Sequence, residues 1–407
     1  MRSEPDAKDP EARCRWDRSI SVGRDHLPHR VGGSVKPSPD GHFPAVWADH
    51  IFRPMLNSDQ RTTPGALWER PSTADLAVII VSTNEAHWLR RCLPTVFDHA
   101  GDAKLDVVVV DNTSTDDTRE LVESEFPGAR IVTSENHGFG HANNCGAMTC
   151  DAPYILFLNP DTEILEGTFG ELLAAMDRQP DVGLAGVIQM AGDGSMIPTI
   201  RYFPSVIRSL AEAFGSEKWP VRATWSRERD LDMTRYGLEV DCDWTSGSFM
   251  LARREALLAA GLLDERFFLQ CEEPDLCMRI KRAGWRVRHL PSMTILHHGK
   301  TEVRPKMVAQ EAYARRQYAQ KHFSKPHGSA YIAAVGLGHA VRALSPRQSA
   351  PRREAARLAL RTIAGRTAPP FGAPPQTALP SLTTAADHDA SNEPMAPPAL
   401  VNGLPRS

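Results

Sequence analysis

Short apolar runs alternate with amphipathic stretches through the middle of this 407-residue chain. The runs at 76–81, 105–110, 131–133 and 154–158 are rich in Val, Ile and Leu, which is typical of strands buried on both faces of a sheet. Amphipathic stretches follow the first three runs and predict helices. This alternation predicts an α/β fold with a mostly parallel sheet and helices on both of its faces.

Polar and helix-breaking residues indicate where these helices begin and end. Asn84 is the expected N-cap of the first helix, and Pro94 should bend or end it. Ser114 or Thr115 is the expected N-cap of the second helix, and the third covers about 139–149. The loops before these helices lie at carboxyl ends of predicted strands, where such sheets bind ligands.

The pattern beyond residue 165 is less regular. We expect a helix over 166–178, a hairpin of 182–190 with 196–200, helix and loop over 205–240, a strand over 244–251, and helices over 254–260, 274–283 and 305–322. Pro274 is the expected first residue of its helix.

Proline divides the chain unevenly. Of the 32 prolines, nine lie before residue 75 and twelve after residue 325, which leaves 11 in the central part. We therefore expect a poorly ordered leader at 1–74, a folded domain at 75–325 that is long enough to bury a large core, and a disordered tail at 367–407.

Residues 326–366, between the folded domain and the tail, are rich in Ala and Arg. The stretch 353–361 predicts a basic amphipathic helix. Two interpretations stay open: a helix on an anionic membrane surface, or a solvated helix in a loose tail.

Charge and cysteine content exclude several classes of protein. The net charge is −3 and the central part has no basic stripe, so no nucleic-acid partner is expected. The start of the chain lacks the apolar stretch of a secretory signal, and no run of 18 apolar residues predicts a spanning helix. The seven cysteines form no C-x-x-C pair, so we expect reduced thiols in a cytoplasmic protein.

Asp161 follows the run 154–158 directly, in the sequence Asn159-Pro160-Asp161. A carboxylate at this position can hold a divalent cation that bridges two phosphates and stabilises the charge on a departing nucleotide. It can equally cap the turn before Thr162, and these three residues alone favour neither interpretation.

Glu272, Glu273 and Asp275 lie together at the start of a predicted helix. Acids so close raise one another's pKa, whereas a helix N-terminus favours their ionised forms. Such a cluster suits a general base that takes a proton from an acceptor hydroxyl. Simple enrichment of acids in the first turn of a helix is the other interpretation.

Two further segments carry candidate ligands. His297 follows a predicted strand, where a neutral imidazole can complete a transition-metal site or serve a structural role. The segment 136–146 contains Gly138-x-Gly140, but Asn143 replaces the third glycine of a dinucleotide motif, which excludes a hydride-transfer enzyme. Asn143 or Asn144 can hydrogen-bond to a nucleotide there, unless the segment is only a tight turn before a helix.

Seven segments in the same order resemble the family 2 glycosyltransferases with the GT-A fold, specifically their rhamnosyltransferase-like branch. They are 78–84, 108–116, 136–146, 157–163, 243–250, 267–277 and 283–299. The resemblance covers about residues 75–322. It implies a nucleotide-binding sheet with a smaller acceptor-side β/α part.

The resemblance also implies a role for each matching position. Residues that would bind the nucleotide sugar are Ser82, Asn84, Glu85, Asp111, Asn112, Ser114, Asn136, Gly138, Asn143, Asn144 and Asn159. Asp161 would hold the metal with His297, Glu273 would be the base with Glu272 as its substitute, and Trp244, Ser246 and Gly247 would line the acceptor side. Asp275 would support the helix start.

Three positions depart from the family pattern. Ser82-Thr83-Asn84 stands where the family commonly has Asn-Tyr-Asn, which alters how the base can stack. Glu273 replaces an aspartate, and Pro274 replaces an aliphatic residue. The acids are kept, so we still expect activity.

These observations predict an inverting glycosyltransferase that uses Mn²⁺ or Mg²⁺. It would move a sugar, with rhamnose favoured, from a dTDP- or UDP-sugar to a glycan, lipid-linked or small-molecule acceptor, in the cytoplasm and with peripheral membrane contact as an option. The alternative is an inactive nucleotide-sugar-binding or scaffold protein of the same fold. A sugar-phosphate nucleotidyltransferase is excluded because residues 82–85 replace the Gly-, Arg- and Lys-bearing loop that it needs.

Overall fold

The computed structural model describes residues 73–220, 223–299 and 304–372. The predicted leader and the predicted tail lie outside these ranges, except for the residues next to the folded part. Cys14 also lies outside them, and the six described cysteines are free thiols, as the sequence predicts. No helix within the described ranges is long and apolar enough to cross a membrane.

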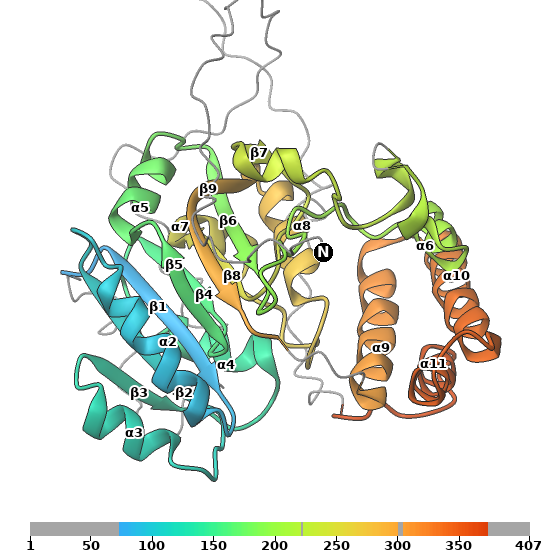
Figure 1. Ribbon diagram of the computed structural model, residues 1–407, viewed down its shortest axis with the longest axis horizontal. Coiled ribbons are helices and arrows are strands. Elements are labelled where there is room, and N and C mark those ends of the chain that lie inside the picture. The colour runs from blue at the N-terminus through green and yellow to red at the C-terminus, as the bar shows by residue number, and fades with distance from the viewer. Residues whose placement is uncertain (1–72, 221–222, 300–303, 373–407) are drawn as a thin grey trace, which may run out of the picture. The chain divides into compact units, whose positions relative to one another are not determined.

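Four parallel strands form the first half of the sheet (Figure 1). They are β1 (Leu76–Ser82), β2 (Leu105–Asp111), β3 (Ala129–Thr133) and β4 (Tyr154–Leu158), in the order β3-β2-β1-β4. All seven residues of β1 are buried, because this strand has neighbours on both edges and helices on both faces. Each of the four strands lies where the sequence predicts one.

The second half of the sheet is mixed. It contains β5 (Thr162–Glu166), β6 (Val182–Met190), β7 (Val240–Asp241), β8 (Phe249–Arg253) and β9 (Arg286–His297). The order continues β4-β8-β6-β9-β5, with β7 on β9. Because β8 is antiparallel to β4, the residues that precede β8 lie beside the carboxyl end of β4.

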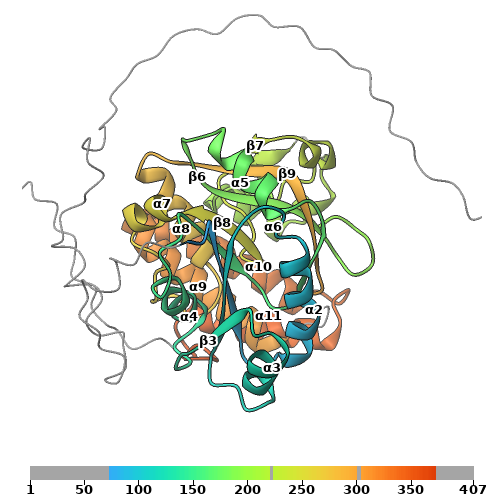
Figure 2. The same ribbon diagram turned by 90° about the vertical axis from the view of Figure 1, so that its left-hand side faces the viewer.

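Helices cover both faces of the sheet (Figures 1 and 2). One face packs on α2 (Ala86–Asp98), α3 (Thr118–Glu125) and α5 (Phe169–Asp177), and the other on α4 (Phe139–Ala147), α7 (Arg254–Ala260) and α8 (Glu272–Arg282). Successive strand residues point to opposite faces, so Val78 and Ile80 face the first layer and Ala77 and Ile79 the second. The result is the three-layer α/β fold that the sequence predicts.

The predicted starts of three helices are wrong. Glu85, not Asn84, is the N-cap of α2, and α3 begins only at Thr118, after Asp117. The Asn84 side chain turns instead to the Ser114–Asp116 loop, where its Oδ1 accepts a hydrogen bond from the Thr115 N–H at 2.6 Å. Likewise α8 begins at Glu272, so Pro274 is its third residue.

Other differences concern the less regular half of the chain. Pro94 lies inside α2 without ending it. The expected helix at 166–178 begins at Phe169, after a strand, β5, that the sequence did not predict. The hairpin beyond β6 shrinks to one bridge between Met190 and Met196, and the strand expected over 244–251 is β8.

The region 205–240 contains short helices, as the mixture of helix and loop predicts. They are α6 (Val206–Ala213), η3 (Ser216–Lys218), η4 (Thr224–Ser226) and η5 (Met233–Gly237).

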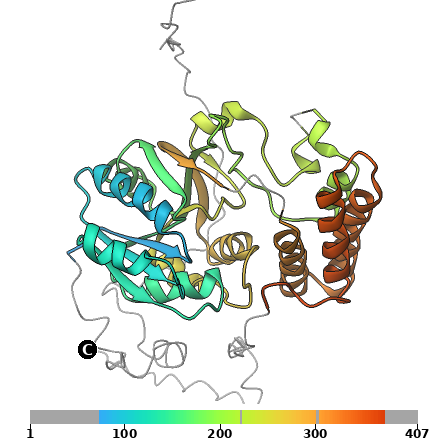
Figure 3. The same cartoon turned by 60° about the horizontal axis from the view of Figure 1, so that its bottom comes forward.

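Three long helices near the end of the described chain pack with α6 (Figure 3). They are α9 (Pro305–His322), α10 (Lys325–Leu344) and α11 (Ala350–Ile363). Ala359 and Ile363 of α11 are buried in a cluster with Ala312, Tyr331 and Val335. The interpretation of 353–361 as a solvated helix in a loose tail is therefore wrong, and the apolar face of that helix is covered by protein.

Candidate active site

Most candidate residues meet at one edge of the sheet. Ser82 and Asp111 are paired residues at the carboxyl ends of β1 and β2, and Asn159–Asp161 follow β4. The same edge includes Gly247 and Ser248, which directly precede β8. There the Asn159 N–H donates to the Ser248 carbonyl at 3.0 Å. The antiparallel pairing of β8 with β4 thus brings distant segments to the end of β4.

Two loops at this edge are joined by hydrogen bonds. The Asn112 N–H donates to the Ser82 carbonyl at 2.9 Å, and the Ser114 N–H donates to Asp111 Oδ1 at 2.9 Å. Asn112 is buried, and its Oδ1 has no hydrogen-bond partner among the described residues. A buried, unpaired acceptor at the end of a strand is available to a ligand, because leaving it unpaired is costly.

Several predicted nucleotide ligands instead hold the loops in place. Asn84 in the loop after β1 contacts Ser114 in the loop after β2, where the Asn84 N–H donates to Ser114 Oγ at 3.0 Å. Glu85 is partly exposed at the start of α2, and Asn136 is exposed in the turn before α4. Both side chains are therefore at least partly accessible from solvent.

The two asparagines of α4 are used by the protein itself. Asn144 Nδ2 donates to the Leu263 carbonyl and to Glu265 Oε1, both at 2.9 Å, while its Oδ1 accepts from the Leu263 N–H. Asn143 donates to the Phe139 carbonyl and is 1% exposed. These contacts fix α4 against residues 263–265, which gives both side chains a structural reason to be there.

Gly138 marks a close approach between two segments. Its φ is +110°, and a Cβ there would lie 2.4 Å from the Phe268 carbonyl oxygen. The neighbouring Phe139 N–H donates to that same carbonyl at 2.8 Å. Only glycine fits this site, so Gly138 connects the turn before α4 to the loop that leads into α8.

Asp161 and His297 lie side by side at the edge of the sheet. β5 pairs with β9 so that Thr162 is opposite His297, and His297 Nε2 lies 3.4 Å from Asp161 Oδ1. Both side chains are partly exposed. Two ligands of one cation, each at about 2.1 Å, lie roughly 3 Å apart, so this pair fits a shared divalent ion.

The remaining ligands of such an ion would have to come from elsewhere. Within the described ranges no group of three His, Cys, Asp or Glu side chains is arranged to hold a metal. Mg²⁺ is commonly bound by one or two protein carboxylates together with substrate phosphates. The pair Asp161 and His297 therefore fits a metal that arrives with a diphosphate rather than a permanent structural ion.

The next histidine and acid form a separate pair. His298 Nε2 bonds to Glu163 Oε1 at 2.5 Å, Arg91 also reaches Glu163 at 2.6 Å, and the His298 ring stacks on Trp88 at 4.6 Å. These contacts attach the residue after β9 to α2 and engage the His298 imidazole with Glu163, while the His298 N–H donates to the Asp161 carbonyl at 3.0 Å. They leave His297 as the histidine available to a metal.

Glu273 is the accessible acid of the cluster at the start of α8. It is partly exposed, and its Oε1 accepts a hydrogen bond from the Gly247 N–H at 3.2 Å. Burial raises its pKa above the ordinary 4.5, although the charge of Arg201 opposes this shift. A raised pKa and contact with the segment before β8 suit a general base.

Glu272 has a different environment. Its side chain is 2% exposed, and its Oε1 is buried without a hydrogen-bond partner among the described residues. Burial, and then the neighbouring Glu273, hold its pKa well above 4.5. Burial therefore disfavours the ionised form of Glu272, which makes it a poorer base than Glu273.

Asp275 belongs to an ion-pair network rather than to the accessible site. It is fully buried and contacts Arg279 at 2.7 Å, Lys321 at 2.5 Å and His322 at 2.7 Å. Burial alone would raise its pKa, but the hydrogen bond from His322 and the charges of Arg279 and Lys321 lower it. Asp275 thus connects α8 to α9.

Asp275→Asn is expected to lower the free energy of unfolding by about 3–5 kcal/mol, because it removes the carboxylate that pairs with Arg279 and one of the two that pair with Lys321. Chemical denaturation at neutral pH measures this. The control is Asp117→Asn, because Asp117 forms an exposed ion pair with Arg90. This substitution should change the free energy of unfolding by less than about 1 kcal/mol. Since the folded pKa of Asp275 is lowered, its contribution is complete above about pH 4 and is lost as the pH falls further. Equal stability of the two variants would contradict this assignment.

The predicted acceptor residues line the approach to Glu273. Gly247 has no room for a side chain, since a Cβ there would lie 2.4 Å from Glu273 Oε1. Trp244 Nε1 donates to the Tyr202 carbonyl at 3.0 Å, and Ser246 Oγ lies 3.1 Å from Ser248 Oγ. Gly247 therefore lies against Glu273, and the acceptor role of Trp244, Ser246 and Gly247 stays a prediction.

Arg201 is a candidate that the sequence did not reveal. Its guanidinium lies 5.1 Å from the centre of the Trp244 ring, its charge acts on Glu273, and its Nε is buried without a described hydrogen-bond partner. It comes from an irregular segment that carries no motif. The antiparallel bridge of Arg201 with Trp244 brings this cation to the site.

Comparisons with known proteins give a consistent picture. A model described as Glycosyl transferase family 2 matches residues 77–257. The chain is 33% identical over 238 residues to the N-acetylglucosaminyl-diphospho-decaprenol L-rhamnosyltransferase of Mycobacterium tuberculosis, covering 55% of this chain and 76% of that protein. It is 24% identical over 235 residues to rhamnosyltransferase WbbL of Escherichia coli, covering 54% and 82%. The solved mannosyltransferase PcManGT of Pyrobaculum calidifontis, in complex with GDP-Man and Mn²⁺, gives a TM-score of 0.44 at 18% identity, over 75% of this chain and 87% of that one.

Proposed function

The chain belongs to glycosyl transferase family 2, and on that premise we propose that it transfers rhamnose to a hydroxyl of a lipid-linked glycan with inversion at the transferred carbon. The donor would be a dTDP- or UDP-sugar. The similarity to rhamnosyltransferases over most of their length supports both the sugar and a diphospho-polyprenol-linked acceptor.

The observation that carries the proposal is that one segment connects the two candidate groups: Ser248 bonds to Asn159, two residues before Asp161, and the adjacent Gly247 bonds to Glu273. In a direct displacement, Glu273 would take the proton from the acceptor hydroxyl as the hydroxyl oxygen attacks the sugar. The hydrogen bond from the Gly247 N–H would hold this carboxylate in place. A single base on the face opposite the leaving group is enough for inversion.

The donor would lie along the loops at the ends of β1, β2 and β4. We propose that Ser82, Glu85, Asp111, Asn112 and Asn136 hold the nucleoside, with Asn159 near the diphosphate. Asn84, Ser114, Gly138, Asn143 and Asn144 would shape this pocket through the contacts described above. A divalent ion between Asp161, His297 and the diphosphate would stabilise the negative charge that develops on the leaving nucleotide.

Arg201 would contribute to the same site. Its cation lies beside Glu273 and Trp244, which suits recognition of an anionic group on the donor or acceptor. An inactive binding protein remains the alternative function. It is disfavoured because Glu273 and Asp161 keep the environments that the chemistry needs.

The experiment that tests the proposal uses the full chain with a panel of dTDP-, UDP- and GDP-sugars, Mn²⁺ or Mg²⁺, and an N-acetylglucosaminyl-diphospho-polyprenol acceptor. We expect release of nucleoside diphosphate with dTDP-rhamnose that depends on the acceptor, and a product whose anomeric configuration is opposite to that of the donor. Donor binding without turnover of any sugar would favour the inactive alternative, and a product of retained configuration would contradict the direct displacement.

A further inference from the structure

α10 presents an apolar stripe to solvent. Ala333, Leu337, Val341 and Leu344 follow one another at intervals of four, four and three residues, so they lie on one face of the helix. All four are exposed, and Leu344 is 82% exposed. The opposite face of the helix, which includes Tyr331 and Val335, is buried against its neighbours.

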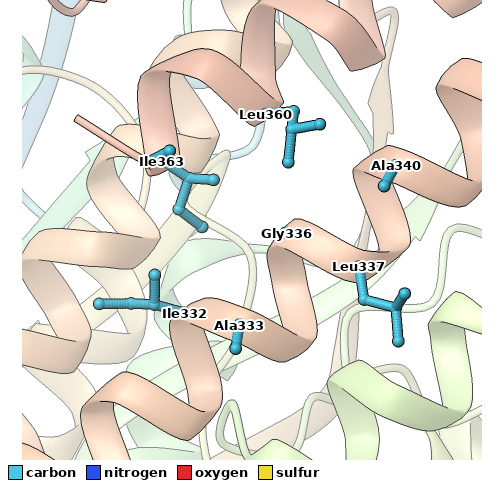
Figure 4. Close-up of a pocket in the computed structure, with 8 residues that line it drawn as sticks. Ile332, Ala333, Gly336, Leu337, Ala340, Leu360 and Ile363 are labelled. Atoms are coloured by element: carbon cyan, nitrogen blue, oxygen red, sulfur yellow. The ribbon is translucent and has the colours of Figure 1, made fainter. Parts of the chain in front are cut away.

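The stripe continues into a groove between α10 and α11 (Figure 4). The groove has a volume of about 370 Å³, and its lining consists of Ile332, Ala333, Gly336, Leu337, Ala340, Leu360, Ile363 and Ala364. No charged side chain lines it. An exposed apolar surface of this kind normally serves as a contact site.

The segment that forms the groove is strongly cationic. Between Lys325 and Arg366 the chain has eight Lys and Arg side chains but a single carboxylate, Glu354. Arg357 lies one turn before Leu360 on the same face of α11, and Arg361 is its immediate neighbour. Both arginines are exposed, as are Arg342, Arg347 and Arg366.

α6 adds a second exposed apolar face beside α10. The two helices are in contact at Gly338, whose added Cβ would lie 3.6 Å from the Ala213 side chain. Ile207 and Leu210 of α6 are exposed, as is Phe214 directly after it, to 68%. Their spacing also places them on one face of the helix.

We propose that the exposed faces of α10, α11 and α6 form a docking surface for an anionic phospholipid bilayer. Apolar side chains between arginines are the arrangement that binds the interface of such a membrane, where the apolar groups enter the acyl boundary and the cations meet the phosphates. A second copy of this chain is a poorer occupant, because two equally cationic surfaces repel each other. The surface differs from the one first expected, since the apolar side of 353–361 faces the protein.

Vesicle flotation of the full chain tests this surface. The probes are vesicles of phosphatidylcholine alone and vesicles of equal parts phosphatidylcholine and phosphatidylglycerol. We expect binding to the anionic vesicles, about tenfold weaker binding to the neutral ones, and weaker binding at high salt. No donor or acceptor sugar is present, so failure of this proposal is distinguishable from failure of the transferase proposal.

Two variants and two matched controls locate the surface. Leu337→Ser with Leu344→Ser, and separately Arg357→Gln with Arg361→Gln, should each weaken binding to anionic vesicles about tenfold. The controls replace exposed residues elsewhere on the protein: Leu238→Ser for the apolar variant, and Arg90→Gln with Arg178→Gln for the arginine variant. Both controls should bind the vesicles like the native chain.

Three results would overturn the proposal. The native chain could stay unbound to anionic vesicles, or the variants could bind as tightly as their controls. The third is a dimer of the native chain in sedimentation that the Leu337→Ser, Leu344→Ser variant fails to form, which would assign the stripe to a second copy.

Discussion

Glu273→Gln is expected to lower kcat for sugar transfer by about 10²–10⁴-fold while donor affinity is kept. The amide of glutamine has nearly the same volume and can still accept the hydrogen bond from the Gly247 N–H. It cannot take a proton from the acceptor. Steady-state kinetics with donor binding measured by calorimetry would separate loss of the base from loss of the pocket.

The pH dependence gives a second readout of the same residue. Because burial raises the pKa of Glu273 above 4.5, kcat/KM should fall as the pH drops through this raised value and the base becomes protonated. Glu273→Gln should remove that acidic limb from the residual activity. A structural role for Glu273 would leave the shape of the profile unchanged.

Two companion variants sharpen the assignment. Glu272→Gln changes a carboxyl whose burial already disfavours ionisation, so kcat should stay near that of the native chain. Gly247→Ala keeps both acids, but its Cβ must displace the Glu273 carboxylate and should lower kcat. If Glu272→Gln abolishes transfer while Glu273→Gln retains it, the two roles are reversed.

Asp161→Asn is expected to remove metal dependence together with about 10²–10³-fold of the activity. The amide keeps the size of the side chain but loses the negative charge that would hold a divalent ion beside His297. Mn²⁺ binding in the presence of a nucleoside diphosphate, followed by electron paramagnetic resonance, tests this without relying on turnover.

Glu163→Gln is the matched control for Asp161→Asn. Glu163 lies two residues further on, but its carboxylate is paired with Arg91 and His298. Its loss should leave Mn²⁺ binding intact. If Glu163→Gln weakens Mn²⁺ binding as strongly as Asp161→Asn does, the metal would be assigned to the wrong acid.

The sequence by itself determined the nucleotide-binding half of this protein. The strands β1 to β4 are apolar over most of their length because helices cover both faces of the sheet. Short apolar runs of this composition are typical of buried parallel strands, so the sequence predicts them directly. The loops after them follow from the same pattern, which is why Asp111 and Asp161 could be placed at one edge before any contact was known.

Tertiary structure decided what the side chains at that edge do. Asn84, Asn143 and Asn144 have the chemistry of ligands, yet their partners are backbone groups and side chains as far away in the chain as Leu263. The resemblance already implied a supporting role for Asp275, but its contacts with Lys321 and His322 of α9, more than 40 residues later, are visible only in the structure. Arg201 reaches the site through one bridge to Trp244.

The same division holds for the end of the described chain. The period of charged and apolar residues predicted that 353–361 is helical, and α11 is there. It could not show which side of that helix faces protein, because that depends on α9 and α10 packing against it. A local pattern fixes the helix, whereas only its neighbours in space determine which apolar residues are left exposed.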